Sequence, residues 1–200
     1  MPCLYKDQPV SEKHFISAQQ LLDDAFELGL KVLDSGFRPN FIVGVWRGGT
    51  PVGIAVQEVL DYFGSPSDHI AIRTSSYDGV EQRARQIRVH GLSYIVKNVN
   101  AEDSVLIVDD VWDTGLSIEA VIEHLREESR RNMPQDIRVA TAYFKPSKNM
   151  TSARPDYFVH ETDRWLVFPH ELHGLTSDEI VAHKPGIGAI LERIRPPVAE

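Results

Sequence analysis

The chain has 200 residues, of which 42% are hydrophobic and 25% are charged, and its formal net charge is −8. This length suits one domain with a full hydrophobic core, and the composition is typical of a soluble globular protein. The acidic balance argues against non-specific nucleic-acid binding, which needs a basic surface, and no apolar run reaches the roughly 20 residues of a membrane span.

The N-terminus and the cysteine content indicate the compartment. Residues 1–6 lack the apolar segment of a secretory signal peptide, so we expect a cytoplasmic protein. The only cysteine, Cys3, cannot form an internal disulfide and is no convincing nucleophile. A phosphorylated ligand is still compatible with the acidic balance, because a local nest of N–H groups and a few cations can overcome it.

The first expected elements are a scaffold helix and a strand followed by a second helix. Residues 11–36 are predicted to be helical, with Ser17 as a cap and Gly36 at the end. Residues 41–45 have the pattern of a buried strand, and helical spacing of apolar residues begins at Val52. We expect the first helix to serve as scaffold.

The loop after this strand can bind an anion. Arg47 supplies a fixed cation, and Gly48 and Gly49 let the backbone approach a ligand closely. Taken alone, Arg-Gly-Gly more often marks only a turn. We expect Trp46 to pack beneath the loop rather than to touch the ligand.

The next segment combines a hairpin with a polar run. Residues 69–73 alternate like a strand, and residues 88–96 are expected to return as a second strand. Residues 80–86 are polar on every side and cannot bury enough surface to order themselves. They are a candidate mobile flap whose arginines would meet phosphates on closure.

The chain is organised around residues 104–117. Four branched apolar residues at 105–108 predict a strand buried on both faces, and helical spacing begins at Ile118. The turn between them has free N–H groups that can cradle a phosphate. Asp109 and Asp110 stand at its rim, where carboxylates can accept hydrogen bonds from a sugar diol or hold Mg²⁺ through water.

The C-terminal part supplies one more buried strand and two short apolar segments. Residues 137–144 are predicted to be a strand that delivers Lys145. Residues 157–159 and 165–168 are expected to form the last apolar pair.

The tail is expected to hold two short helices. Thr176 and Glu179 have the spacing of a capping box that opens the first, and the second covers residues 187–194. None of the eight histidines has metal-ligand spacing, so solvated or hydrogen-bonded histidine is the better interpretation.

The run Asp109-Asp110-Val111-Trp112-Asp113-Thr114-Gly115-Leu116-Ser117 resembles the phosphoribosyl diphosphate (PRPP) motif of type I phosphoribosyltransferases. In that motif apolar strand residues precede two acids, two variable residues and Asp-Thr-Gly-x-Thr/Ser. A capping acid and a turn glycine would be enough to explain one strand-to-helix junction. Here, however, nine consecutive positions match the motif.

Three other motifs do not fit. Gly48 and Gly53 have the glycine spacing of a Walker loop, but Ile54 follows where lysine is needed. No Gly-x-Gly-x-x-Gly occurs. The two acids of a haloacid-type hydrolase stand two apart, whereas Asp110 and Asp113 are three apart.

The resemblance implies where PRPP and its cofactor Mg²⁺ bind. Asp109 and Asp110 would hold the ribose, Asp110 with the closer tie to the metal. Asp113 would lie near purine N7, where it could take or share a proton. The implied 5′-phosphate cradle is Thr114, Gly115, Leu116 and Ser117.

A second resemblance is to the pyrophosphate loop of purine phosphoribosyltransferases, which matches Trp46, Arg47, Gly48 and Gly49. In that family a peptide bond of this loop can be cis without proline, and here it would be the bond between Trp46 and Arg47. Ser76 and Tyr77 look like the start of the catalytic flexible loop of the xanthine-guanine and hypoxanthine-guanine enzymes.

The purine site implied by the resemblance comes from the last strands. Lys145 would face the 6-oxo group, Trp165 would stack on the ring, and Leu166 would offer backbone groups to its edge. Phe168-Pro169-His170-Glu171 resembles the bacterial hood sequence, with His170 in place of the usual aromatic residue. The implied catalytic residues are Asp113, Arg47 and Lys145.

Four buried strands that alternate with helices predict an α/β fold, an open and mainly parallel twisted sheet flanked by helices. The resemblance adds a small hood subdomain. We expect one phosphoribosyltransferase domain over residues 1–200, with a core at about 37–145 and a hood at about 146–175 plus the chain ends.

The implied function is a 6-oxopurine phosphoribosyltransferase that uses PRPP and xanthine, guanine or hypoxanthine, and that forms a homodimer or homotetramer. It would bind neither nucleic acid nor membranes. Two alternatives stay open. One is a regulator of the same fold that senses PRPP, and the other is a transferase for another base, such as uracil or orotate. Lys145 and Trp165 count against both.

Overall fold

The computed structural model describes residues 13–77 and 86–187. The chain divides into two compact units. The core unit is Leu22–Asp163, and the terminal unit joins the two chain ends, Met1–Leu21 and Arg164–Glu200. Cys3, most of the candidate flap and residues 188–194 of the helix expected at 187–194 lie outside the described residues.

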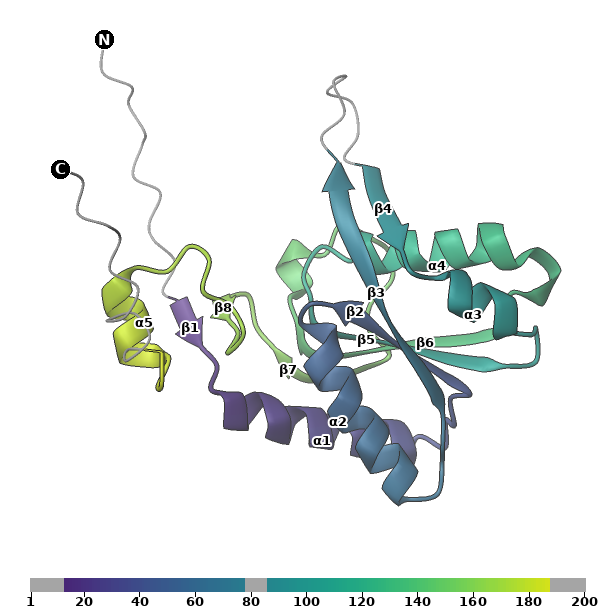
Figure 1. Ribbon diagram of the computed structural model, residues 1–200, viewed down its shortest axis with the longest axis horizontal. Helices are drawn as coiled ribbons and strands as arrows, with labels where there is room; N and C mark the ends of the chain where they lie inside the picture. The colour runs from purple at the N-terminus through teal and green to yellow at the C-terminus, as the bar shows by residue number, and fades with distance from the viewer. Residues whose placement is uncertain (1–12, 78–85, 188–200) are drawn as a thin grey trace, which may run out of the picture. The chain divides into compact units, whose positions relative to one another are not determined.

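The core unit contains a six-stranded sheet in the order β4-β3-β2-β5-β6-β7. Neighbouring strands are parallel, except that β4 is antiparallel to β3 (Figure 1). This confirms the expected open, mainly parallel sheet. The strands are β2 (Phe41–Trp46), β3 (Asp68–Tyr77), β4 (Gln86–His90), β5 (Ser104–Trp112), β6 (Asp136–Phe144) and β7 (Tyr157–Glu161).

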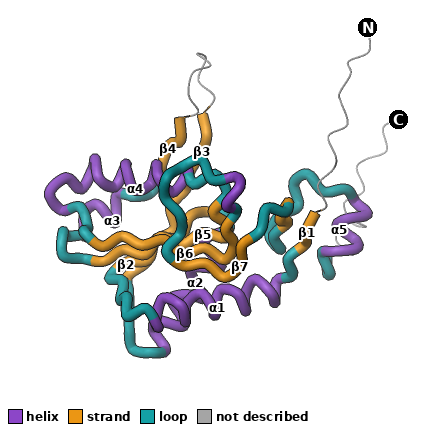
Figure 2. The backbone as a smooth tube through the Cα atoms, turned by 180° about the vertical axis from the view of Figure 1, so that it is seen from behind, coloured by secondary structure: helices purple, strands orange, loops and turns teal. Residues whose placement is uncertain are grey.

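Helices cover both faces of the sheet, which explains the continuous apolar runs of β2 and β5. Helices α1 (Ala18–Asp34) and α2 (Gly49–Tyr62) lie on one face, and α3 (Ser93–Asn98) and α4 (Leu116–Ser129) on the other (Figure 2). Helices α1 and α2 pack closely, since a Cβ added at Gly29 would lie 2.9 Å from the Cβ of Val59. Short 3₁₀ turns follow at Arg130–Asn132 and Pro146–Lys148.

The first helix and the strand expected to return after the flap are both shorter in the structure than predicted. The first helix begins at Ala18 rather than at 11, because Ser17 caps it through a hydrogen bond from the Gln20 N–H (3.1 Å), and residues before a cap lie outside the helix. The segment expected to return as a strand up to residue 96 ends at His90, and α3 follows. The spacing of the buried Leu92, Ile95 and Val99 is helical.

The last two apolar segments do not pair with each other, which corrects the sequence-based expectation. Strand β7 pairs with β6 at the edge of the main sheet, whereas β8 (Trp165–Val167) pairs in parallel with β1 (Lys13–Phe15) in the terminal unit. Parallel partners need a long connection, and here they come from opposite ends of the chain. The terminal unit is completed by α5 (Ser177–His183).

Helix α5 begins with the expected capping box. The Thr176 hydroxyl accepts a hydrogen bond from the Glu179 N–H (3.2 Å), and the Glu179 carboxylate accepts one from the Thr176 N–H (2.8 Å). The Thr176→Ala variant should therefore lower the free energy of unfolding by about 1 kcal/mol, measured by urea denaturation. Ser177→Ala is the matched control, since that hydroxyl is not part of the box. Equal stabilities of the two variants would contradict the capping role.

Candidate functional site

The carboxyl ends of β2 and β5 bring the two glycine-containing turns together. The strands are adjacent and parallel, with Gly44 opposite Val108. The contact between the turns is tight, because a Cβ added at Gly48 would lie 1.8 Å from Oδ2 of Asp110. At Gly49 it would lie 2.2 Å from the carbonyl oxygen of Val108. Only glycine lets the loop after β2 lie against the two acids near the end of β5.

The peptide bond between Trp46 and Arg47 is cis, as expected for this loop. The Arg47 side chain is exposed, and the Thr50 N–H donates to the Arg47 carbonyl (3.3 Å). Trp46 does not pack beneath the loop, which corrects that expectation, since 54% of its surface is exposed. Both side chains are therefore open to a ligand.

The turn after β5 has the geometry of an anion cradle. Gly115 has φ +79° and precedes α4, a helix of 14 residues, so the first N–H groups of the helix at 116–118 point away from the helix body. The Thr114 carbonyl accepts a hydrogen bond from the Met150 N–H (2.9 Å). The backbone of Thr114, Gly115, Leu116 and Ser117 is thus placed to receive a phosphate group.

Three residues that support this cradle were not singled out from the sequence. Trp112 is buried, and its Nε1 donates to Oδ1 of Asn149 (3.1 Å). A Cβ at Gly115 would lie 2.7 Å from that Nε1 and 2.8 Å from Oγ1 of Thr151. Trp112 occupies a variable position of the motif, and Asn149 and Thr151 lie in a polar loop without periodicity, so no local pattern identifies them.

Asp109 and Asp110 form an acidic pair at the rim of the cradle. Asp110 is buried, and the Asp110 N–H donates to Oδ1 of Asp109 (2.9 Å). Burial, and next the charge of Asp110, raise the pKa of Asp109 well above its usual range. A cation would relieve both effects, and carboxylate oxygens are ligands that suit Mg²⁺. Within residues 13–77 and 86–187 no cluster of three or more His, Cys, Asp or Glu side chains could hold a metal.

Lys145 and Asp113 meet above the ends of β5 and β6. The Lys145 Nζ lies 3.5 Å from Oδ2 of Asp113, with the lysine side chain mostly buried and the aspartate half exposed. The Lys145 N–H donates to the Trp112 carbonyl (2.9 Å), which fixes the backbone at this point. The ammonium of Lys145 and the carboxylate of Asp113 thus lie together beside the anion cradle.

The remaining predicted residues lie on other strands. Ser76 and Tyr77 are the last residues of β3, opposite Ile87 and Gln86 of β4, at the base of the candidate flap. Trp165 and Leu166 lie on β8 in the terminal unit, where Trp165 is 51% exposed and Leu166 is buried. Glu171 forms a turn, since its carboxylate accepts the Phe168 N–H (3.0 Å).

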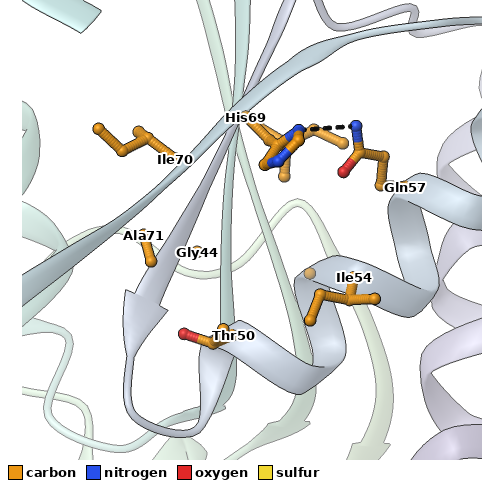
Figure 3. Close-up of a pocket in the computed structure, with 9 residues that line it drawn as sticks. Gly44, Thr50, Ile54, Gln57, His69, Ile70 and Ala71 are labelled. Carbon is orange, nitrogen blue, oxygen red and sulfur yellow. Dashed lines mark hydrogen bonds between the residues drawn. The ribbon is translucent and has the colours of Figure 1, made fainter. Parts of the chain in front are cut away.

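A separate apolar groove of about 190 Å³ lies between α2 and β3. Figure 3 shows the Gln57 side chain on α2 reaching the His69 ring on β3, with Nε2 3.0 Å from Nδ1. Its lining includes none of the predicted site residues. The charged and glycine-rich turns at the strand ends, rather than this groove, are the candidate site. None of the described helices is long and apolar enough to cross a membrane.

Comparisons with known proteins agree with this geometry. A family model for the phosphoribosyl transferase domain matches residues 16–173. The purine phosphoribosyltransferase of Pyrococcus horikoshii is 30% identical, with 82% of this chain and 97% of that chain covered and a TM-score of 0.62. A comparison with curated proteins gives no match.

Two further solved structures share the fold. The xanthine-guanine-hypoxanthine phosphoribosyltransferase of Helicobacter pylori is 23% identical, over 78% of this chain and 92% of that chain, with a TM-score of 0.61. A hypothetical protein from Neisseria gonorrhoeae with bound ppGpp is 17% identical, over 88% and 97%, with a TM-score of 0.70. The matched motif, the sheet and these comparisons lead to one conclusion: the chain belongs to the type I phosphoribosyltransferases, in their purine branch, and is a pentosyltransferase.

Proposed function

We propose that this enzyme transfers the 5-phosphoribosyl group from PRPP to a 6-oxopurine, which is xanthine, guanine or hypoxanthine, and releases pyrophosphate. The observation that carries the proposal is the contact of three strand-end turns in the core unit. The loop of Gly48 presses against Asp110, and the lysine after β6 pairs with Asp113. The groups that we propose for pyrophosphate and for ribose phosphate, and the lysine that we propose for the base, would thus adjoin one another.

PRPP would lie along the first two turns. The N–H groups from Thr114 to Ser117 would hold the 5′-phosphate, and Asp109 and Asp110 would accept hydrogen bonds from the ribose hydroxyls. Trp46, Arg47, Gly48 and Gly49 would border the pyrophosphate, with the exposed guanidinium of Arg47 as the cation. Asp110 is the residue we propose for Mg²⁺, which when bound would neutralise negative charge on the departing pyrophosphate.

Catalysis would rest on positioning and electrostatics. As pyrophosphate leaves ribose C1′, positive charge develops on the sugar and negative charge on the leaving group. Asp109 and Asp110 would flank the positive charge on the sugar. Arg47 and the loop N–H groups would face the negative charge on the pyrophosphate. Asp113 would take or share the purine N7 proton as the base attacks. Ser76 and Tyr77 would begin the loop that covers the reacting atoms.

The base would be recognised by its oxo group. The Lys145 ammonium, held by Asp113, donates to an O6 acceptor, whereas the amino group of adenine would present a donor to a donor. Trp165 has enough exposed surface to stack on a purine, and the backbone of Leu166 would meet the ring edge. Of these groups, the Lys145 ammonium is the one that supports a 6-oxopurine over adenine.

An ultraviolet assay with xanthine, guanine, hypoxanthine and adenine, each with PRPP and Mg²⁺, tests the proposal. We expect turnover with at least one oxopurine, none with adenine, and loss of turnover when EDTA removes the metal. Uracil and orotate test the transferase for another base. Turnover of a pyrimidine alone would replace the proposal with that alternative, and PRPP binding without any turnover would favour a PRPP-sensing regulator.

We also propose a cytoplasmic homodimer or homotetramer. Apolar side chains exposed on and just after α2 support association, namely Ile54, Tyr62 and Phe63. Sedimentation velocity at micromolar concentration would check it, and a monomer would contradict it.

A further inference from the structure

Two lysines connect α5 to the segment that carries Trp165. Lys184, directly after α5, is 5% exposed, and its ammonium donates a hydrogen bond to the Phe168 carbonyl. Lys13 on β1 pairs with Glu179 of α5 at 2.8 Å, and its Nζ lies 5.5 Å from the centre of the Trp165 ring. All of these residues belong to the terminal unit, in which α5 lies beside β1 (Figure 1).

The Phe168 carbonyl is the point where these contacts converge. It accepts the Glu171 N–H (3.0 Å) as well as the Lys184 ammonium, and the Phe168 N–H donates to the Glu171 carboxylate (3.0 Å). Phe168 follows β8 directly. The described pairing of β8 is three residues long and is made with the three-residue strand β1. Because so short a strand pair is weak by itself, the hydrogen bonds at its end help to hold β8 in position.

Burying the Lys184 ammonium costs free energy, because the charge loses its hydration. Burial lowers the pKa of Lys184, and the Glu171 carboxylate opposes part of that effect. The desolvation of its charge offsets part of the stabilisation that the hydrogen bond supplies. What the ammonium adds is direction, because its hydrogen bond specifies the position of one carbonyl.

We propose that Lys184 is a positioning residue for base recognition, which acts through the Phe168 carbonyl to place Trp165 and Leu166. Lys13, between Glu179 and the Trp165 ring, is the second connection from α5 to the same strand. Helix α5 therefore sets both the affinity of the enzyme for the base and its preference among the oxopurines. This inference rests on the proposed function, in which Trp165 and Leu166 bind the base.

Lys184→Met tests it, because methionine keeps the unbranched stem and removes the ammonium. The KM for the preferred purine should rise about 10-fold or more through misplacement of the hood, while the KM for PRPP stays within about twofold. The ratio of kcat/KM values among xanthine, guanine and hypoxanthine should also change. Lys184→Arg should recover part of the purine affinity. Lys31→Met, which removes the partner of Glu27 on α1, is the matched control and should change neither KM.

Different results would contradict the role of Lys184 and the proposed purine transfer. If Lys184→Met does not fold, Lys13→Met takes its place and should raise the purine KM in the same direction. Unchanged purine KM and base ratios in the folded variants would overturn the inference, as would an equal rise in both KM values. A wild-type protein that binds PRPP but turns over no oxopurine would overturn the proposed function, and this inference with it.

Discussion

Replacing Asp113 by asparagine should lower kcat for purine turnover about 10²-fold or more, which is the size of a lost general acid-base contribution. The amide has nearly the same shape as the carboxylate but cannot accept the N7 proton. PRPP should still bind, because the cradle consists of backbone N–H groups that the substitution leaves in place. Steady-state kinetics measure the first effect, and calorimetric titration of PRPP with Mg²⁺ measures the second.

The ion pair between Asp113 and Lys145 offers a competing explanation for such a loss, and a second variant separates the two. If Asp113 acted only by holding Lys145, then Lys145→Gln should reduce kcat as strongly. We expect that variant to raise the KM for the base instead, since it replaces the charged donor to O6 with a shorter, neutral amide. Asp61→Asn, at an exposed position of α2, controls for the loss of one negative charge. Unchanged kcat in Asp113→Asn would remove the proton-transfer role.

The central part of the fold follows from local sequence signals. Strand β5, the turn with Gly115 and α4 are consecutive in the chain, so apolar runs, a glycine and helical spacing specify them together. The fold class and the family were therefore predicted correctly. The roles of the individual site residues are still predictions.

Long-range pairing is where the sequence-based expectation was wrong. Strands β7 and β8 look alike as short apolar segments, yet one joins the main sheet and the other pairs with β1 about 150 residues away. No local pattern encodes that choice. No sequence pattern identifies Lys184 or Asn149 either. The role of each depends on a distant partner, which is the Phe168 carbonyl for Lys184 and the Trp112 indole for Asn149.

Gly49→Ala should weaken PRPP binding, because the new methyl group would collide with the central strand. Its Cβ would lie 2.2 Å from the Val108 carbonyl oxygen and 2.8 Å from the Cα of Asp109. Both are backbone atoms of a buried strand, so relief requires the loop of Arg47 to move away from the acids. Calorimetric titration of PRPP with Mg²⁺ should show an affinity roughly 5- to 150-fold weaker, since about 1–3 kcal/mol of overpacking is typical.

Gly53→Ala in the same helix is the matched control. A Cβ there meets nothing closer than 3.8 Å, and alanine is the better helix former by roughly 0.5–1 kcal/mol. We therefore expect that variant to unfold at a higher temperature and to bind PRPP as the wild type does. Equal PRPP affinity of the two variants would mean that the loop of Arg47 and the acids of β5 do not act on one ligand, because the contact that joins them would then be irrelevant to binding.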